Sequence, residues 1–248
     1  MKISPLLFHY TIFIGNETIL MGQYLHYFNS ETEFNTFVKN NYGEPWTSCV
    51  EDGSVEYNFP KYVDLGLPSG NLWATKNLGA ETPYEIGDAF KWGETGASTS
   101  DSYIFGKSAP YSKYNPTDGL ATLMLEDDAA YANYTDVPYG YIARIPTPNE
   151  FLELQRNCKM TLDSVNHLTI FQSNINGRHL VFPGIDNSIS SFSVWTSEIY
   201  TRYSEYGYAQ RFCAYSESNA RYVGMETAVR TSSAINVRGV LVPGTINR

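Results

Sequence analysis

The chain has 248 residues, a formal net charge of −9 and a hydrophobic content of 42%, so it can fold around a substantial core. Charged residues make up only 17% of the chain and aromatic residues 15%, with twenty tyrosines among the latter. The acidic balance and the lack of a basic stripe argue against nucleic acid and against an anionic membrane surface as partners.

The first predicted elements are two short strands, over residues 10–14 and 19–27, with a turn at Gly15-Asn16-Glu17 between them. Both stretches are rich in β-branched and aromatic residues, and Gly-Asn is a frequent turn dipeptide. The apolar run 3–15 could pass for a signal peptide, but a proline, a histidine and a tyrosine interrupt it and no small-residue cleavage site follows. Since the run is also too short to span a bilayer, we expect strands here and no membrane insertion.

A short helix is predicted after these strands, and a domain boundary some way after the helix. Ser30-Glu31-Thr32-Glu33 forms a capping box, in which the serine can accept from the amide three residues on and the glutamate can reach back. Two further strands are expected within 44–58, around a turn at Asp52-Gly53. We therefore divide the chain into a β-rich segment with one short helix, residues 1–60, and a main domain, residues 61–248.

Glycine, proline and asparagine punctuate the main domain, which is typical of short strands joined by long loops. The stretch 96–118 is especially loop-like. One helix is predicted to begin at Thr147, because Thr147 and Glu150 form a capping box and Pro148 suits the first helical position. Strands are expected at residues 181–183, 193–197, 208–215, 228–231 and 236–242.

Three groups of motifs in the main domain carry a family resemblance. The first group is the unbroken run 62–75, followed by residues 77–80 and 87–95. The second group is the acidic string at 126–130 and the arginine-isoleucine-proline-threonine string at 144–147, which leads into the predicted helix. The third group lies near the end of the chain, at residues 195–197 and 237–240.

These motifs resemble the Fibrobacter succinogenes major paralogous domain, which is common in gut Bacteroidetes. The string at 144–147 is also shared with formylglycine-generating-enzyme-like members of the C-type-lectin superfold. The family usually ends in serine-valine-arginine-proline-valine, and here Asn236 and Gly239 replace the serine and the proline. The resemblance implies an α+β, C-type-lectin-like domain with small twisted antiparallel sheets, few helices and long loops, preceded by the small β-rich N-terminal segment.

The N-terminal segment has a resemblance of its own. His26-Tyr27-Phe28, the string at 30–35 and the string at 44–48 are similar to segments in structural proteins of crAss-like phages of gut Bacteroidetes. This likeness implies that residues 1–60 attach the chain to other virion proteins or oligomerise it. It would also explain an extracytoplasmic character without an export signal, because virion proteins leave the cell by lysis.

Catalytic motifs give no support for an enzyme. Formylglycine-generating enzymes use a pair of cysteines near the C-terminus, and here only Cys213 lies in that region. The four histidines form no metal-binding pattern, and no nucleophile elbow, phosphate-binding loop or dinucleotide fingerprint occurs. Asp88 and Glu94 could be taken for the carboxylate pair of a glycosidase, but they flank aromatic residues that we expect to be structural. We therefore expect no enzymatic activity.

No cofactor is expected, with calcium as the alternative. The acidic cluster Glu126-Asp127-Asp128 could supply calcium ligands from a loop, but calcium needs six or more oxygens and only three side chains are local. The other interpretation is that the cluster begins a helix and favours its dipole. Cys49, Cys158 and Cys213 lie far apart in the sequence, which favours free, buried thiols over a disulfide framework.

The segment 195–222 has the composition of a recognition surface. Its tyrosines alternate with serine, asparagine and arginine, a mixture that occurs in binding loops and in interface hot spots. The alternative is a tyrosine-rich sheet packed against a neighbouring subunit, and the tryptophans are expected to be largely core. The residues expected to bind ligand are Trp195, Tyr200, Tyr203, Tyr206, Arg211, Tyr215 and Tyr222.

These patterns favour a binding protein on the surface of a phage virion, such as a head fibre or a tail-tip decoration. The main domain would attach to a glycan or a protein of the host surface, and the chain would form a homo-oligomer, a dimer or a trimer. A bacterial cell-surface adhesin is the alternative, followed by a glycan-active enzyme. Residues 1–60 would contact other virion proteins in the first case.

Overall fold

The computed structural model describes residues 12–14, 17–19, 61–99, 102–163, 167–184, 191–202, 205–217 and 220–244. The chain divides into two compact units, residues 1–58 and 59–248. In the first unit, β1 (Ile12–Ile14) and β2 (Glu17–Ile19) pair antiparallel, with Ile12 opposite Ile19 and Ile14 opposite Glu17. The predicted helix at Ser30, the strands within 44–58 and the phage-like strings lie outside the described residues.

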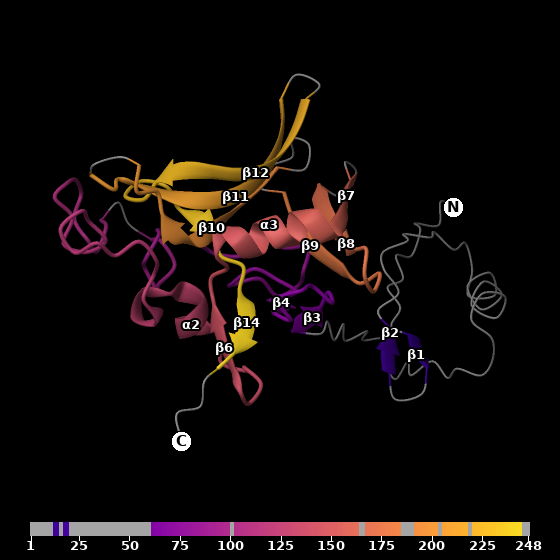
Figure 1. Ribbon diagram of the computed structural model, residues 1–248. Helices are drawn as coiled ribbons and strands as arrows, with labels where there is room; N and C mark the ends of the chain where they lie inside the picture. Colours follow the sequence, from indigo (N-terminus) through magenta and orange to yellow (C-terminus); the bar gives the residue numbers. More distant parts are fainter. Residues whose placement is uncertain are drawn as a thin grey trace, which may run out of the picture. The chain divides into compact units, whose positions relative to one another are not determined.

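The second unit contains a five-stranded sheet with the strand order β12-β11-β10-β13-β5. Its neighbours are antiparallel except for β10 and β13, which run parallel. Figure 1 shows β10, β11 and β12 as a long twisted ribbon with helix α3 along it, and these elements are in contact. The strands are β5 (Ala89–Phe90), β10 (Phe192–Ile199), β11 (Tyr208–Glu217), β12 (Ala220–Val229) and β13 (Ile235–Asn236).

A four-stranded antiparallel sheet joins the opening of this unit to its end. Its order is β3-β4-β14-β6, so β4, which lies within the run 62–75, pairs with the last strand, with Val240 opposite Trp73. Arg238 lies two residues before β14 and strengthens this junction by donating to the backbone oxygens of Ala74 and Thr75. The strands are β3 (Tyr62–Asp64), β4 (Leu72–Ala74), β6 (Tyr141–Arg144) and β14 (Val240–Pro243).

The third sheet of this unit is an antiparallel meander of β7 (Cys158–Asp163), β8 (Leu168–Ser173) and β9 (His179–Pro183). It directly follows α3 (Pro148–Asn157), whose predicted start is confirmed: Thr147 caps the helix, Glu150 completes the box and Pro148 opens the first turn. A short 3₁₀ turn, η1 (Leu125–Asp127), and α2 (Ala129–Asn133) precede β6. In the described part of the chain, no helix is long and apolar enough to cross a membrane.

Two hydrophobic clusters lie on opposite faces of the five-stranded sheet. Successive side chains of a strand point to opposite faces, and Phe192 and Phe212 belong to one cluster whereas Trp195 and Ala209 belong to the other. Helix α3 and the β7–β9 meander cover the first face, and the ring of Phe151 stacks on Phe212 at 4.7 Å. The second face is covered by the long loop that the sequence predicts around 96–118, with buried rings supplied by Tyr103, Phe105, Tyr111 and Tyr114.

The α+β class is therefore confirmed at a coarse level, since small and mostly antiparallel sheets are combined with few helices. Two strand predictions are wrong in detail. The stretch 236–242 is not one strand, because Val237, Arg238 and Gly239 separate β13 from β14 and pass from one sheet to another. The expected strand at 228–231 is only the end of β12, which starts at Ala220. No strand was predicted at the positions of β3 to β8.

We expect Gly87→Ala to destabilise the protein by about 2–4 kcal/mol. Gly87 has φ +74°, a conformation that costs any other residue energy, and an added Cβ would lie 2.3 Å from the carbonyl oxygen of Leu78. Gly119 has a similar φ of +67° but no atom within 4 Å of an added Cβ, so Gly119→Ala is the matched control for backbone strain alone. Urea unfolding of both variants measures the difference, and equal losses would show that the contact with Leu78 does not matter.

Candidate functional site

Trp195, expected to contact ligand, lies in the core instead. Its ring is fully buried in the cluster beneath the long loop, and its Nε1–H donates to the carbonyl oxygen of Phe90 at 2.7 Å. Trp92 is bonded in the same way to the carbonyl oxygen of Thr196 at 2.9 Å. Because β10 is a central strand with both faces covered, a large ring at this position fastens strands together and cannot reach a ligand at the surface. Trp195 is therefore removed from the candidate site.

Two of the tyrosines are also set apart from the others. Tyr206, in the connection between β10 and β11, has φ +49° and is half-buried against the same core cluster. Tyr203 lies outside the described residues. The four remaining candidates, Tyr200, Arg211, Tyr215 and Tyr222, lie on or beside the hairpin of β11 and β12.

The register of this hairpin distributes the four residues over its two faces. Arg211 is opposite Glu226 and Tyr215 is opposite Tyr222, so these four side chains share one face. Gln210 is opposite Thr227, one residue out of step, so this pair lies on the other face. Tyr200 follows β10 immediately and is joined to β11 by a backbone hydrogen bond to Tyr208. The residues expected to form one recognition surface therefore lie on two different faces of the hairpin.

The first surface is a polar network centred on the Glu226 carboxylate. Glu226 accepts from Arg211 Nη2 at 2.8 Å through one carboxylate oxygen and from the Tyr215 hydroxyl at 2.8 Å through the other. The Tyr215 and Tyr222 rings stack with centroids 5.0 Å apart. Partial burial would raise the pKa of Glu226, but the hydrogen bonds from Tyr215 and Arg211 outweigh it and lower that pKa. The hydrogen bond to Glu226 raises the pKa of the Tyr215 hydroxyl to about 12. Both groups therefore keep their charge states at neutral pH.

This network also closes part of the sheet edge formed by β12. The carbonyl oxygen of Met225 accepts from the Tyr222 hydroxyl at 2.8 Å, and that of Val223 accepts from Gln155 Nε2 on α3 at 2.9 Å. Unpaired carbonyls on an edge strand invite pairing with another chain. Since two of these acceptors are already used within the molecule, the edge is less available for strand addition around residues 223–225.

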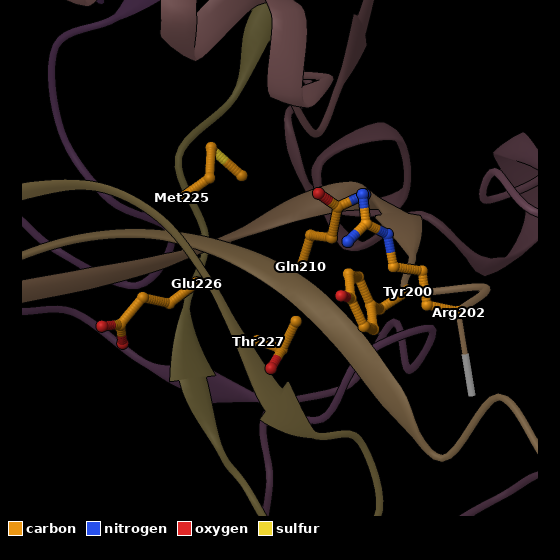
Figure 2. A pocket seen from close by; sticks show the side chains of 6 residues that line it. All are labelled: Tyr200, Arg202, Gln210, Met225, Glu226 and Thr227. Atoms are coloured by element: carbon orange, nitrogen blue, oxygen red, sulfur yellow. The ribbon is translucent and has the colours of Figure 1, made fainter.

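The second surface is an open depression of about 600 Å³ on the other side of the hairpin. Figure 2 shows the side chains of Arg202 and Gln210 reaching the same region with the Tyr200 ring beside it, whereas Thr227 lies farther along the hairpin and the Glu226 carboxylate points away. In the part of the chain that the structure describes, the side chains of Arg202, Gln210 and Thr227 form no hydrogen bond or ion pair. The lining residues are Tyr200, Arg202, Gln210, Met225, Glu226 and Thr227.

The residues that sequence reasoning missed here are Gln210, Met225, Glu226 and Thr227. Gln210 and Thr227 have no distinguishing signal in the sequence, because what brings them together is the β11–β12 register. A depression lined by an aromatic ring, a guanidinium, an amide and a hydroxyl can stack on an apolar ring face and hydrogen-bond to its substituents. The arrangement is suited to binding and holds no engaged acid–base pair, since the Glu226 carboxylate is occupied by Arg211 and Tyr215.

The carboxylates of the acidic cluster Glu126-Asp127-Asp128 make hydrogen bonds and ion pairs within the protein. Lys113 Nζ donates to both Glu126 and Asp127 at 2.6 Å, and the Tyr114 hydroxyl also donates to Asp127. Asp128 caps α2 and accepts from three backbone N–H groups. Glu126 and Asp127 therefore share Lys113, whereas Asp128 is engaged by backbone N–H groups. Among the described residues, no group of three or more histidine, cysteine or acidic side chains could hold a metal ion.

Of the other residues singled out in the sequence, Asp88, Glu94 and Cys158 lie outside the β11–β12 hairpin, whereas Cys213 is on β11 itself, opposite Gly224. Glu94 accepts from the backbone N–H of Ile104 at 2.9 Å and so supports the long loop, while the side chain of Asp88 lies against Gly79. Cys158 and Cys213 are buried free thiols, and burial raises the pKa of Cys158 to about 11. Cys49 lies outside the described residues.

Comparisons of the chain with protein-family models, with curated proteins and with solved structures return no match.

Proposed function

We propose that the chain is a non-enzymatic binding protein on the surface of a phage virion, a head fibre or a tail-tip decoration. Residues 61–248 would form a C-type-lectin-like domain that attaches to a glycan or a protein of the host surface. The observation that carries the binding role is the depression on the β11–β12 hairpin, where three polar side chains without partners surround Tyr200. Residues 1–60 would join the chain to other virion proteins and to further copies of itself, as a dimer or trimer.

The depression supports binding because the side chains of Arg202, Gln210 and Thr227 have no partner among the described residues. On the opposite face, by contrast, the Glu226 carboxylate is engaged by Arg211 and by the Tyr215 hydroxyl, so both of its oxygens are already in use. Groups that line a concavity and remain unpaired keep their hydrogen-bonding capacity for another molecule. The virion assignment depends on the likeness of the N-terminal strings to phage structural proteins.

The proposal is tested by comparing variants of the two hairpin faces in host-cell and glycan-array binding. The variant Tyr200→Ala/Gln210→Ala removes the ring and the amide of the depression, and we expect it to weaken binding by about tenfold or more. The matched control is Tyr215→Ala/Tyr222→Ala, which removes two tyrosines of the opposite face and is expected to retain binding.

Thermal melting and the oligomeric state are measured for each variant, so that loss of fold is distinguished from loss of contact. Loss of binding only in the Tyr215→Ala/Tyr222→Ala variant would move the recognition surface to the other face. Binding by neither the unaltered chain nor any variant would contradict an attachment role and favour a purely structural one.

A further inference from the structure

Arg202 is a positively charged side chain at the depression that has no acidic partner among the described residues. The chain carries 26 acidic and only 17 basic residues, yet Arg202 is exposed at the depression and forms no ion pair or hydrogen bond with the described residues. By contrast, Arg211 on the neighbouring strand β11 forms an ion pair with Glu226 at 2.8 Å. The positive charge of Arg202 is thus not compensated locally.

The acid that lines the depression does not offset this charge. Glu226 is bonded through both carboxylate oxygens to Arg211 and the Tyr215 hydroxyl, and its carboxylate points away from the depression in Figure 2. The polar groups that remain are the Arg202 guanidinium, the Gln210 amide and the Thr227 hydroxyl. The guanidinium only donates hydrogen bonds, and the amide and the hydroxyl can donate as well as accept. This set favours an anionic acceptor over a neutral one.

The geometry and chemistry of the lining narrow the class of anion. A guanidinium presents two parallel N–H groups that match a carboxylate, which makes such contacts stronger than neutral hydrogen bonds. The half-exposed ring of Tyr200 adds an apolar face that a sugar ring can cover. We infer that the depression binds an acidic saccharide, with Arg202 holding the carboxylate of a uronic or nonulosonic acid residue.

The inference rests on the proposed function, because it names the ligand class of the same depression. In this arrangement Tyr200 stacks on the sugar ring, Gln210 and Thr227 bond to its hydroxyls, and Arg202 distinguishes the acid from the neutral sugar. Removing the charge of Arg202 should therefore abolish the preference for acidic sugars, while weak binding through the ring and the hydroxyls persists.

The test uses two pairs of probes that differ in the carboxylate. The full chain is titrated with tetragalacturonate and its complete methyl ester, and with 3′-sialyllactose and its carboxyl methyl ester. We expect at least one acid to bind about tenfold more tightly than its neutral counterpart, the size of one charge-assisted contact. Arg202→Gln should remove that difference, and Arg202→Lys should restore only part of it because a lysine lacks the planar fork.

Lys107→Gln is the matched control, because it makes the same change in net charge at another exposed cation, outside the depression. It should leave the acid preference unchanged. Equal binding of acid and neutral probes, or an acid preference that survives Arg202→Gln, would overturn the inference while the proposed attachment role stands. A chain that binds host cells but none of the four probes also overturns it. Failure to bind host cells as well would overturn the proposed function itself.

Discussion

Replacing Arg238 with alanine is expected to lower the free energy of unfolding by about 3–5 kcal/mol, because four acceptors in the interior lose their hydrogen bonds to a charged donor. Arg238 is completely buried, and burial lowers the pKa of its guanidinium to about 10. Its N–H groups donate to Asn77 Oδ1 and to the carbonyl oxygens of Ala74, Thr75 and Val181, at 2.9–3.1 Å. Alanine would leave all four acceptors without this partner.

The same substitution also removes a packing contact between two sheets. The guanidinium lies 4.5 Å from the centre of the Phe182 ring on β9, while its backbone partners Ala74 and Thr75 are at and just beyond the end of β4. Lysine keeps the charge but cannot donate in several fixed directions, so Arg238→Lys should recover only part of the loss.

Urea unfolding followed by fluorescence measures the effect of Arg238→Ala. Arg178→Ala is the matched control, since Arg178 also donates to a backbone carbonyl, that of Asp64 at 3.2 Å, but its side chain is 54% exposed. We expect the control to cost less than about 1 kcal/mol. A loss for Arg238→Ala no larger than that for Arg178→Ala would show that Arg238 does not hold the sheets together.

Asp128→Ala is the second substitution for which we expect a large effect, about 2–4 kcal/mol of destabilisation. The Asp128 side chain is 1% exposed and accepts from Ala130 N at 2.8 Å, Tyr131 N at 3.1 Å and Ile145 N at 2.9 Å. The first two bonds cap α2, and the third joins that cap to the residue after β6. Alanine would leave these N–H groups without their acceptor in the interior.

The charge of Asp128 gives this effect a pH dependence. Burial raises the pKa of the carboxyl to about 6, although the three N–H groups oppose the rise. Between about pH 4 and pH 6 the native state therefore binds more protons than the unfolded state, whose carboxyl has a pKa near 3.9. The contribution of Asp128 to the free energy of unfolding must then fall as the pH rises through this window, by up to about 3 kcal/mol.

Asp128→Asn supplies the comparison, because its amide does not titrate and can still accept hydrogen bonds. The free energy of unfolding of the unaltered chain minus that of Asp128→Asn should decrease from pH 4 to pH 7. A difference that stays constant, or that increases with pH, would show that the buried carboxyl has no raised pKa. Circular dichroism during urea titration at several pH values provides the measurement.

The sequence alone was enough for features that depend on neighbouring residues. The start of α3 was predicted correctly because Thr147, Pro148 and Glu150 make all their capping contacts within one turn. The loop around 96–118 was likewise predicted from its local composition of small and turn-forming residues. The meander strands β7 and β8 were missed, since β7 follows α3 without any intervening turn residue and its strand state depends on pairing with β8.

The candidate site could be located only roughly from the sequence. Its composition indicated the region 195–222, and Tyr200 does line the depression. Whether a given side chain reaches the surface was decided by the sheet: Trp195 is buried because β10 is central, and Arg211 faces Glu226 because of the β11–β12 register. Composition and capping act over a few residues, whereas register and strand order join residues far apart in the chain. Tertiary structure alone therefore decided that Arg202, Gln210 and Thr227 share one surface.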